Sequence, residues 1–174
     1  MRYAQIRNMD ISNGENLGVS LFVQGCHFHC KNCFNPETWN FNGGKEWNEE
    51  VENRFFELID RPYIKRISIL GGEPLADENV HDIFELIVKL KISFPEKNIW
   101  LYSGYQFEDI VNNPTKNTES TLREKVVKIC DVLVDGRYVD ELRDLTLKFR
   151  GSSNQRVISV KESLKDNKIV LYNN

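Results

Sequence analysis

The hydrophobic positions of the chain form short apolar runs separated by longer stretches with helical spacing. The run VSLFVQG at 19–25 mixes β-branched and aromatic residues and stops at a glycine, as a buried strand does before a turn. Apolar residues then recur at helical spacing over 46–59, which predicts an amphipathic helix. The next apolar run, RISIL at 66–70, predicts a second strand that is closed by Gly71 and Gly72.

The same alternation continues in the second half of the chain. Apolar residues between 80 and 90 share one helical face, and NIWLY at 98–102 predicts a third strand. A further helix is expected over 121–130, because Thr121 and Glu124 have the spacing of a capping box. The second half therefore repeats the strand and helix order of the first.

The run DVLVDG at 131–136 predicts a fourth strand, and 112–120 is expected to form an exposed loop. Strands that alternate with helices of this length indicate βαβ units, because parallel neighbours need a crossover helix. We therefore predict an α/β fold with a parallel sheet, in one domain over 1–174. Ligand sites in such sheets gather at the carboxyl ends of the strands. The cysteine-rich segment at 26–33 lies at such an end.

Composition agrees with this fold and narrows the function. The 174 residues are 40% hydrophobic and 28% charged, which is typical of a compact globular chain. A net charge of −3 gives no sign of nucleic-acid binding. No apolar run approaches the roughly 20 residues that cross a bilayer, and the first ten residues lack the apolar core of a signal peptide. We therefore expect a cytoplasmic protein that contacts no membrane.

Three of the four cysteines lie within eight residues, in the stretch CHFHCKNCFNPETW at 26–39. In a reducing compartment, clustered cysteines more often bind metal or perform redox chemistry than form disulfides. Cys26, Cys30 and Cys33 have the spacing CxxxCxxC, which lets three thiolates converge from one loop. Cys130 ends an apolar helical face and is expected to pack in the core as a small hydrophobic residue.

Two kinds of site are compatible with three cysteines. Structural zinc is usually closed by four protein ligands, so His27, His29 or Cys130 would have to complete it. Both histidines lie inside the first cysteine interval, where bending back to the metal is sterically awkward, and are expected to be loop residues. An iron–sulfur cube has four iron corners, and three thiolates would leave one iron free to bind a substrate directly.

Four stretches in order carry a resemblance to a known family. They are GCHFHCKNCFNPETW, GGEPL, WLYSGY and LVDGRYVDELRDLTLKFRGSSNQRVI, within about residues 6 to 158. The chain resembles the radical S-adenosylmethionine superfamily and, more narrowly, the activating proteins of anaerobic ribonucleoside-triphosphate reductase. The resemblance implies a partial (βα) barrel. It also implies a [4Fe–4S] cluster on Cys26, Cys30 and Cys33, whose fourth iron chelates S-adenosylmethionine.

The resemblance implies an activity as well. The reduced cluster would cleave S-adenosylmethionine, and the 5′-deoxyadenosyl radical would generate a glycyl radical on the reductase, with no side chain acting as acid or base. Implied partners are that reductase and a low-potential electron donor such as a flavodoxin-like protein. Implied assemblies are a homodimer or a heterotetramer with the reductase.

Two alternative functions stay open at this point. The first is an activase of another glycyl radical enzyme or a small-molecule radical enzyme of the superfamily. Such proteins commonly carry more chain, and no second cysteine set is present here. The second is a non-catalytic, zinc-stapled binding module.

The resemblance also assigns residues around S-adenosylmethionine. Gly71, Gly72, Glu73 and Pro74 match the family's GGEP segment, which borders the methionine part. A glycine pair lets the backbone come close, and Glu73 can accept a hydrogen bond from an ammonium group. Ser103, at the end of the third predicted strand, is expected to contact the ribose.

This sequence departs from the family pattern at the residues expected to contact adenine. Many members place an aromatic residue immediately before the third cysteine, whereas here Asn32 precedes it and Phe34 follows it. The backbone over 32–34 is expected to contact adenine, with Phe34 as a core aromatic residue the competing interpretation. Trp39 and Trp47 are expected to be packing residues. The C-terminal segment 136–174 is expected to face the protein partner.

Overall fold

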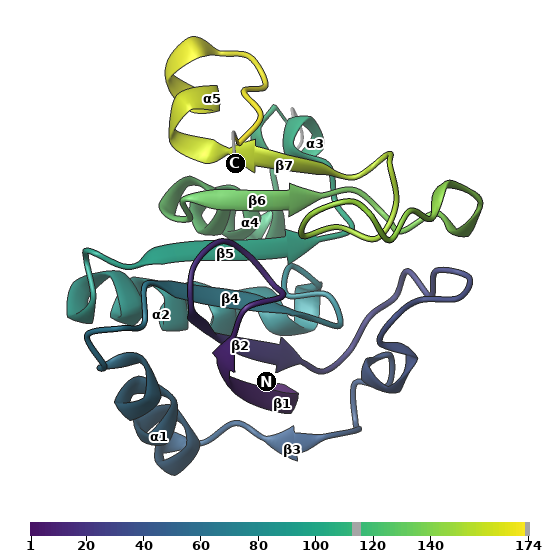
Figure 1. Cartoon of the computed structure of the whole chain (residues 1–174). Helices are drawn as coiled ribbons and strands as arrows, with labels where there is room; N and C mark the ends of the chain where they lie inside the picture. Colours follow the sequence, from purple (N-terminus) through teal and green to yellow (C-terminus); the bar gives the residue numbers. More distant parts are fainter. Residues whose placement is uncertain (113–115, 173–174) are drawn as a thin grey trace.

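The computed structural model describes residues 1–112 and 116–172, which form one mixed sheet covered by helices (Figure 1). The strands are β1 (Arg2–Asp10), β2 (Gly18–Val23), β3 (Lys45–Glu46), β4 (Arg66–Gly71), β5 (Asn98–Ser103), β6 (Val132–Asp135) and β7 (Arg156–Ser159). The helices are α1 (Glu49–Ile59), α2 (Asp77–Ser93), α3 (Phe107–Val111), α4 (Thr118–Ile129) and α5 (Val160–Asp166). Two short 3-10 turns are η1 (Pro36–Thr38) and η2 (Asp140–Leu142).

The sheet has the order β3-β1-β2-β4-β5-β6-β7. The four predicted strands correspond to β2, β4, β5 and β6, which are parallel to one another, so the α/β prediction is confirmed for the centre of the sheet. The prediction of a purely parallel sheet is wrong at both edges, where β1, β3 and β7 pair antiparallel. These strands are half exposed or only two to four residues long, so they lack a strong apolar pattern.

Two helix starts differ from the prediction because asparagine caps decide them. Helix α1 begins at Glu49, after the side chain of Asn48 accepts a hydrogen bond from the Val51 amide at 3.0 Å. Helix α4 begins at Thr118, because the capping box pairs Asn117 with Ser120 and not Thr121 with Glu124. The predicted loop 112–120 is therefore wrong at its end, and its residues 113–115 lie outside the described residues.

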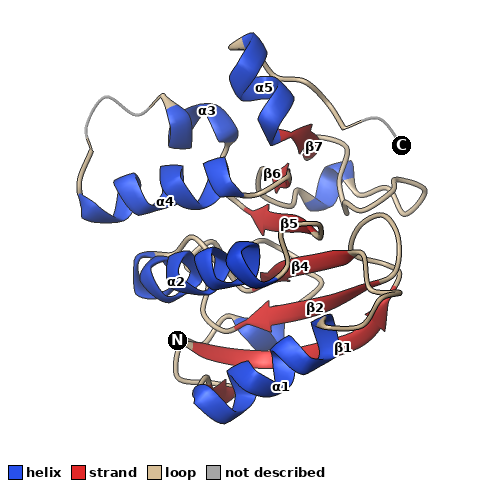
Figure 2. Ribbon diagram, turned by 90° about the vertical axis from the view of Figure 1, so that its left-hand side faces the viewer, coloured by secondary structure: helices blue, strands red, loops and turns tan. Residues whose placement is uncertain are grey.

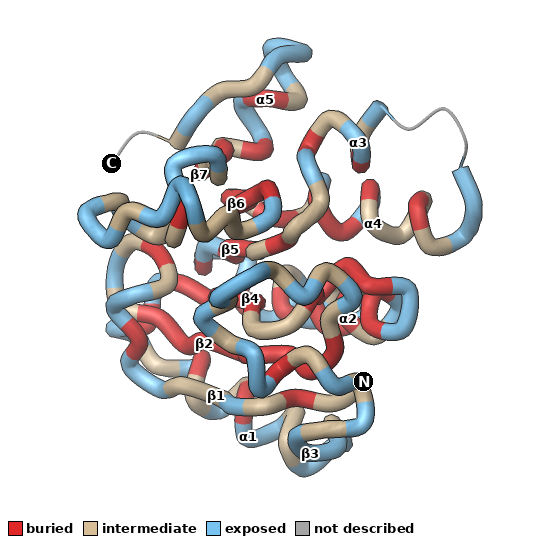
Figure 3. Tube along the Cα trace, turned by 90° about the vertical axis from the view of Figure 1, so that its right-hand side faces the viewer, coloured by how far each residue is buried: buried red, intermediate tan, exposed pale blue. Residues whose placement is uncertain are grey.

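One face of the sheet is covered by α1, α2 and α4 (Figure 2). The strands supply a continuous buried surface to these helices, and the tube in Figure 3 shows the central strands buried between exposed loops. Cys130 belongs to this core at 3% exposure, as predicted. In the part of the chain that the structure describes, no helix combines the length and apolar character needed to cross a membrane.

The other face of the sheet is closed at the amino ends of the parallel strands by a buried arginine, Arg66, the first residue of β4. The loop between β1 and β2 crosses this face (Figure 1). The guanidinium of Arg66, which is fully buried, donates to the backbone carbonyls of Asp10 and Asn13, both at 2.6 Å, and of Glu15 at 3.1 Å. It also pairs with the Asp10 carboxylate at 3.4 Å. Protein side chains and the β1–β2 loop thus fill the space at the amino ends of the parallel strands. A cavity forms at the opposite side, at their carboxyl ends.

We expect Arg66→Leu to lower the free energy of unfolding by about 3 kcal/mol or more. Several carbonyls would lose their donor, and Asp10 would lose its buried cation and keep only the partly exposed Arg7. Urea unfolding of the metal-free protein measures the change. The control Arg54→Leu, on the exposed side of α1, should change stability by less than about 0.5 kcal/mol. Equal losses in both variants would contradict the role assigned to Arg66.

Candidate functional site

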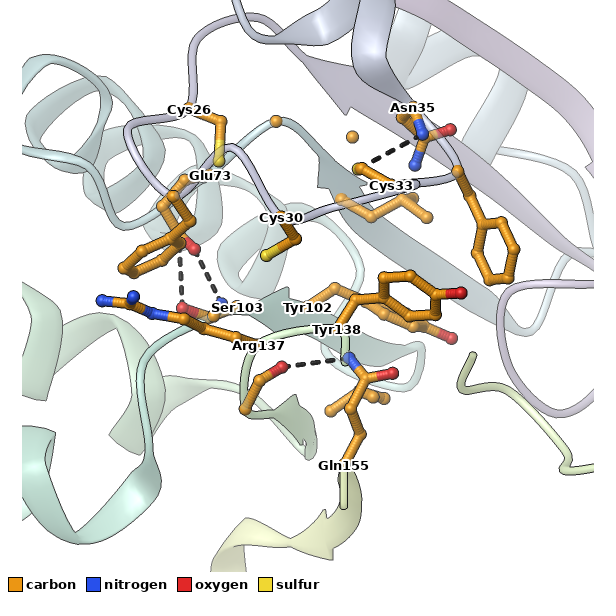
Figure 4. Close-up of a pocket in the computed structure, with 18 of the residues that line it drawn as sticks. Cys26, Cys30, Cys33, Asn35, Glu73, Tyr102, Ser103, Arg137, Tyr138 and Gln155 are labelled. Carbon is orange, nitrogen blue, oxygen red and sulfur yellow. Dashed lines mark hydrogen bonds between the residues drawn. The ribbon is translucent and has the colours of Figure 1, made fainter. Parts of the chain in front are cut away.

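A cavity lies where the cysteine loop meets the carboxyl ends of the central strands (Figure 4). The cavity opens to solvent and has a volume of about 150 Å³. The predicted site residues that line it are Cys26, Cys30, Cys33, Phe34, Gly71, Gly72, Glu73 and Ser103. Asn32 and Pro74 lie beside the cavity in sequence but are not part of its lining.

The cysteine loop leaves the end of β2 and folds back on itself. The Gly25 amide donates to the Thr38 carbonyl at 2.7 Å, and the Cys26 amide donates to Trp39 at 3.1 Å. A tight turn follows, in which the Cys33 amide donates to the Cys30 carbonyl at 3.1 Å. These hydrogen bonds bring all three cysteines to one cavity.

Asn32 occupies the left-handed region of backbone conformation in this turn, with a φ of 54°. Asparagine tolerates that region far better than bulky residues do. An aromatic residue would be strained at the same position. The backbone therefore gives a physical reason for the departure from the family pattern at residue 32.

The sulfur atoms lie where backbone amides can favour their thiolate forms. Burial raises the pKa of the Cys26 thiol, and the amides of Phe28 and His29 oppose that rise. The Asn35 amide donates to Cys33 Sγ at 3.4 Å. Hydrogen bonds to sulfur are one of the means by which proteins tune iron–sulfur clusters.

The second cysteine is in contact with the far part of the chain. Burial and the neighbouring Cys33 raise the pKa of the Cys30 thiol, whereas the backbone amide of Tyr138 and the charge of Arg137 lower it. Figure 4 shows Arg137 and Tyr138 on the side of the cavity opposite the cysteine loop. Residues from the segment after β6 thus complete the surroundings of Cys30.

The surroundings of the cysteines do not suit a closed zinc site. Among the described residues, no three Cys, His, Asp or Glu side chains are placed to bind one metal ion, which needs four donors at about 2.0–2.3 Å in structural zinc. His27 Nε2 lies 2.7 Å from Glu78, and His29 stacks on Trp39 with ring centroids 4.6 Å apart. Cys130 is in the core. An iron–sulfur cube takes each thiolate on a different iron, so three cysteines around one cavity fit it better.

The glycine pair lets the end of β4 pack directly against the start of the cysteine loop. Gly71 has a φ of 105°, which only glycine adopts readily. The Gly72 amide donates to the Val23 carbonyl at 2.9 Å, and a Cβ on Gly72 would lie 2.4 Å from the Gly25 carbonyl oxygen. The expected close approach of the backbone is therefore present, and here it is an approach to the chain itself.

Glu73 connects three strand ends. Its amide donates to the Gly25 carbonyl at 2.7 Å. Its carboxylate accepts from the Leu75 amide at 2.8 Å, from Ser103 Oγ at 2.8 Å and from the Gly104 amide at 2.7 Å (Figure 4). Burial raises the pKa of Glu73 to about 7, although these three hydrogen bonds oppose the rise. Two predicted ligand residues, Glu73 and Ser103, are thus bonded to each other.

Aromatic residues form the other wall of the cavity. Phe34 is half exposed at the rim, outside the core, and packs on Tyr138 with ring centroids 5.0 Å apart. Trp39, expected only to pack, also lines the cavity. The Tyr102 hydroxyl is buried beside the cavity and has no hydrogen-bond partner within the described ranges. Trp47 packs against Phe55, as expected.

The prediction assigned no cofactor contact to several residues that line the cavity, among them Tyr102, Arg137, Tyr138 and Gln155. Tyr102 could have been found, because it directly precedes Ser103 at the end of a predicted strand. The other three lie in irregular segments, so no periodic pattern marks them.

Comparison with known proteins adds independent information. A family model described as "4Fe-4S single cluster domain" matches residues 12–158. The anaerobic ribonucleoside-triphosphate reductase-activating protein of Escherichia coli K12 is 36% identical over 90% of this chain and 97% of its own length. The protein of the same name from Enterobacteria phage T4 is 37% identical over 91% of this chain and 94% of its own length.

These matches cover nearly the whole of both chains and include the cysteine loop, the glycine pair and the strand ends that form the cavity. They support an iron–sulfur activating enzyme over the zinc-stapled binding module. The chain belongs to the family of anaerobic ribonucleoside-triphosphate reductase-activating proteins.

Proposed function

We propose that this chain is a radical S-adenosylmethionine enzyme that installs a glycyl radical on anaerobic ribonucleoside-triphosphate reductase. The family membership supports an activating enzyme with an iron–sulfur cluster. The main support for radical S-adenosylmethionine chemistry is that the three cysteines and the Gly71–Gly72–Glu73 turn line one cavity. We further propose that residues 1–174 form a single domain, and that its sheet is a partial (βα) barrel of the radical S-adenosylmethionine type.

In this proposal Cys26, Cys30 and Cys33 bind three irons of a [4Fe–4S] cluster. Such a cluster would supply one electron to the sulfonium of S-adenosylmethionine, whose C5′–S bond would break to give methionine and a 5′-deoxyadenosyl radical. That radical would take a hydrogen atom from a glycine of the reductase and become 5′-deoxyadenosine. The chain contributes position and exclusion of water, which are the main contributions of a protein to cofactor chemistry. No side chain has to act as an acid or base.

The two walls of the cavity suggest where the parts of S-adenosylmethionine bind. The polar wall contains Gly71, Gly72, Glu73 and Ser103, and we assign the methionine and ribose parts to it. Since Glu73 already accepts three hydrogen bonds, one acceptor position of its roughly four remains for an ammonium group. Pro74 would act by fixing the backbone after Glu73.

We assign adenine to the aromatic wall. Phe34 lines it, and the backbone over 32–34 passes beside it. The Asn32 side chain is turned to Asp140, at 2.7 Å, so only its backbone would serve adenine. Tyr138 packs against Phe34 and extends this wall.

The segment 136–174 would face the reductase. Three large hydrophobic side chains are exposed around the cavity mouth or on the segment beside it, namely Phe34 at 50%, Leu142 at 44% and Leu145 at 73%. A low-potential, flavodoxin-like electron donor and a homodimer or heterotetramer with the reductase complete the proposal.

The function is tested by electron paramagnetic resonance of the reductase after anaerobic incubation with this protein, S-adenosylmethionine and dithionite. We expect a glycyl radical doublet with the wild-type chain. Cys30→Ala should give no doublet and no cleavage of S-adenosylmethionine, because one cluster ligand is lost. Cys130→Ala should retain both, since Cys130 lies in the core.

Two other results would each change the proposal. Cleavage with Cys30→Ala would contradict the ligand assignment. Intact cleavage by the wild type without a doublet on the reductase would favour another glycyl radical enzyme or a small molecule as the radical acceptor.

A second prediction concerns the burial of Glu73. Its folded-state pKa of about 7 lies above the ordinary value of 4.5, so its contribution to stability is complete below pH 4.5 and is lost as the pH rises to 7. Over this range we expect the unfolding free energy of the wild type, relative to Glu73→Gln, to fall by about 3 kcal/mol. Denaturant unfolding of the cluster-free protein at a series of pH values measures it. Glu57→Gln, on the exposed surface of α1, should follow the wild type at every pH.

A third prediction concerns the reductase-facing surface. Replacing Leu142 and Leu145 together by serine should raise about tenfold the reductase concentration needed for half-maximal radical formation, because exposed apolar side chains would be lost from the interface. Cleavage of S-adenosylmethionine without reductase should not change. The control Ile92→Ser alters a 76% exposed side chain near the end of α2, at the opposite end of the sheet from the cavity. An equal effect of Ile92→Ser would argue against this surface.

A further inference from the structure

The turn between Cys30 and Cys33 is held by a segment more than a hundred residues away. Asn32 Nδ2 donates to Asp140 Oδ2 at 2.7 Å across a sequence separation of 108 residues. Asp140 begins the short turn η2, which follows the strand β6 and the Arg137 and Tyr138 side of the cavity. The position of the second half of the cysteine loop, residues 30–33, therefore depends on a contact with this distant segment.

Asp140 is itself fixed on its other side. Its Oδ1 accepts from the Tyr138 hydroxyl at 2.9 Å. The Tyr138 ring packs on Phe34, and the Tyr138 amide lies near the Cys30 sulfur, where it lowers the thiol pKa. One carboxylate thus joins the turn residue Asn32 to Tyr138, whose ring packs on Phe34 and whose backbone amide lies near Cys30.

We propose that Asp140 is a positioning residue for the cluster: by accepting a hydrogen bond from the side-chain amide of Asn32, it fixes the turn that sets the spacing of Cys30 and Cys33. This proposal rests on the proposed function in so far as these cysteines are cluster ligands. Such a contact helps to hold the turn, because a φ of 54° is less favourable than the right-handed region even for asparagine. Residues that orient metal ligands from outside the coordination sphere commonly matter tenfold or more for metal retention.

A neighbouring contact offers a matched control. Lys31 Nζ lies 3.0 Å from Glu141 Oε1, so it joins the same two segments. Both side chains are about two-thirds exposed, and exposed ion pairs of this kind contribute little. Glu141 carries the same charge as Asp140, one residue further along, without touching Asn32.

The test exchanges the two hydrogen-bonding groups. Asn32→Asp keeps a residue that tolerates the left-handed region but places two carboxylates together. Adding Asp140→Asn restores a donor and an acceptor, since Asn at 140 can donate to Asp at 32 and still accept from Tyr138. Adding Glu141→Gln instead removes the same charge without restoring the hydrogen bond. The reconstituted protein of each variant is mixed anaerobically with an iron chelator, and loss of the cluster absorbance is followed with time.

We expect Asn32→Asp to accelerate cluster loss about tenfold. The double variant with Asp140→Asn should lose its cluster at a rate within about twofold of the wild type. The double variant with Glu141→Gln should lose its cluster as fast as Asn32→Asp alone. Asp140→Ala, which adds no charge, should also be fast. Thermal unfolding of the cluster-free variants shows whether the fold is retained, and the spectrum of the reduced cluster reports a change at the cluster itself.

Wild-type rates in both Asn32→Asp and Asp140→Ala would overturn the proposal. Equal rescue by Asp140→Asn and Glu141→Gln would also overturn it, because the effect would then be one of charge alone. These outcomes differ from a failure of the proposed function, in which the wild-type chain itself would bind no [4Fe–4S] cluster.

Discussion

The site depends on one buried residue that joins three strand ends. The amide of Glu73 binds the Gly25 carbonyl at the start of the cysteine loop, and its carboxylate binds Ser103 and Gly104 at the end of β5. The glycine pair before it permits this, because a side chain at Gly72 would collide with the Gly25 carbonyl. The relative position of the cysteine loop, the β4 turn and the β5 turn therefore follows from contacts around a single residue.

Two buried ionisable side chains, one at each end of the parallel strands, are stabilised by hydrogen bonds to the surrounding chain. At the amino ends of the strands, the buried guanidinium of Arg66 is surrounded by carbonyl oxygens, including those of Asp10 and Asn13. At the cavity end, the buried carboxylate of Glu73 is surrounded by N–H and O–H donors, including the Gly104 amide. Burying an ionised group is costly unless it is paired or hydrogen-bonded. These two groups therefore hold their surrounding segments in place, since each segment supplies part of the required hydrogen bonding.

The sequence pattern could predict what depends on local periodicity or spacing. The four parallel strands have apolar runs, and the cysteine loop and glycine pair follow such runs directly, so their meeting at one end of the sheet was predictable. The edge strands and the caps at Asn48 and Asn117 were missed, because strands that are short or half exposed have weak apolar patterns, and so do single cap residues. Asp140 lies in an irregular segment, and its contact with Asn32 depends on tertiary structure alone.

The two halves of the cysteine loop are consequently held by different parts of the chain. The first half is fixed by the central sheet, through the bond between Gly25 and Glu73. The second half is fixed by the segment after β6, through Asp140 and the packing of Tyr138 on Phe34. That segment also carries the exposed side chains Leu142 and Leu145. In the proposed function, a reductase bound to these leucines would contact the same segment that holds the turn between Cys30 and Cys33. Because close-packed protein transmits strain, docking of the reductase would then be coupled to the geometry of the cluster ligands.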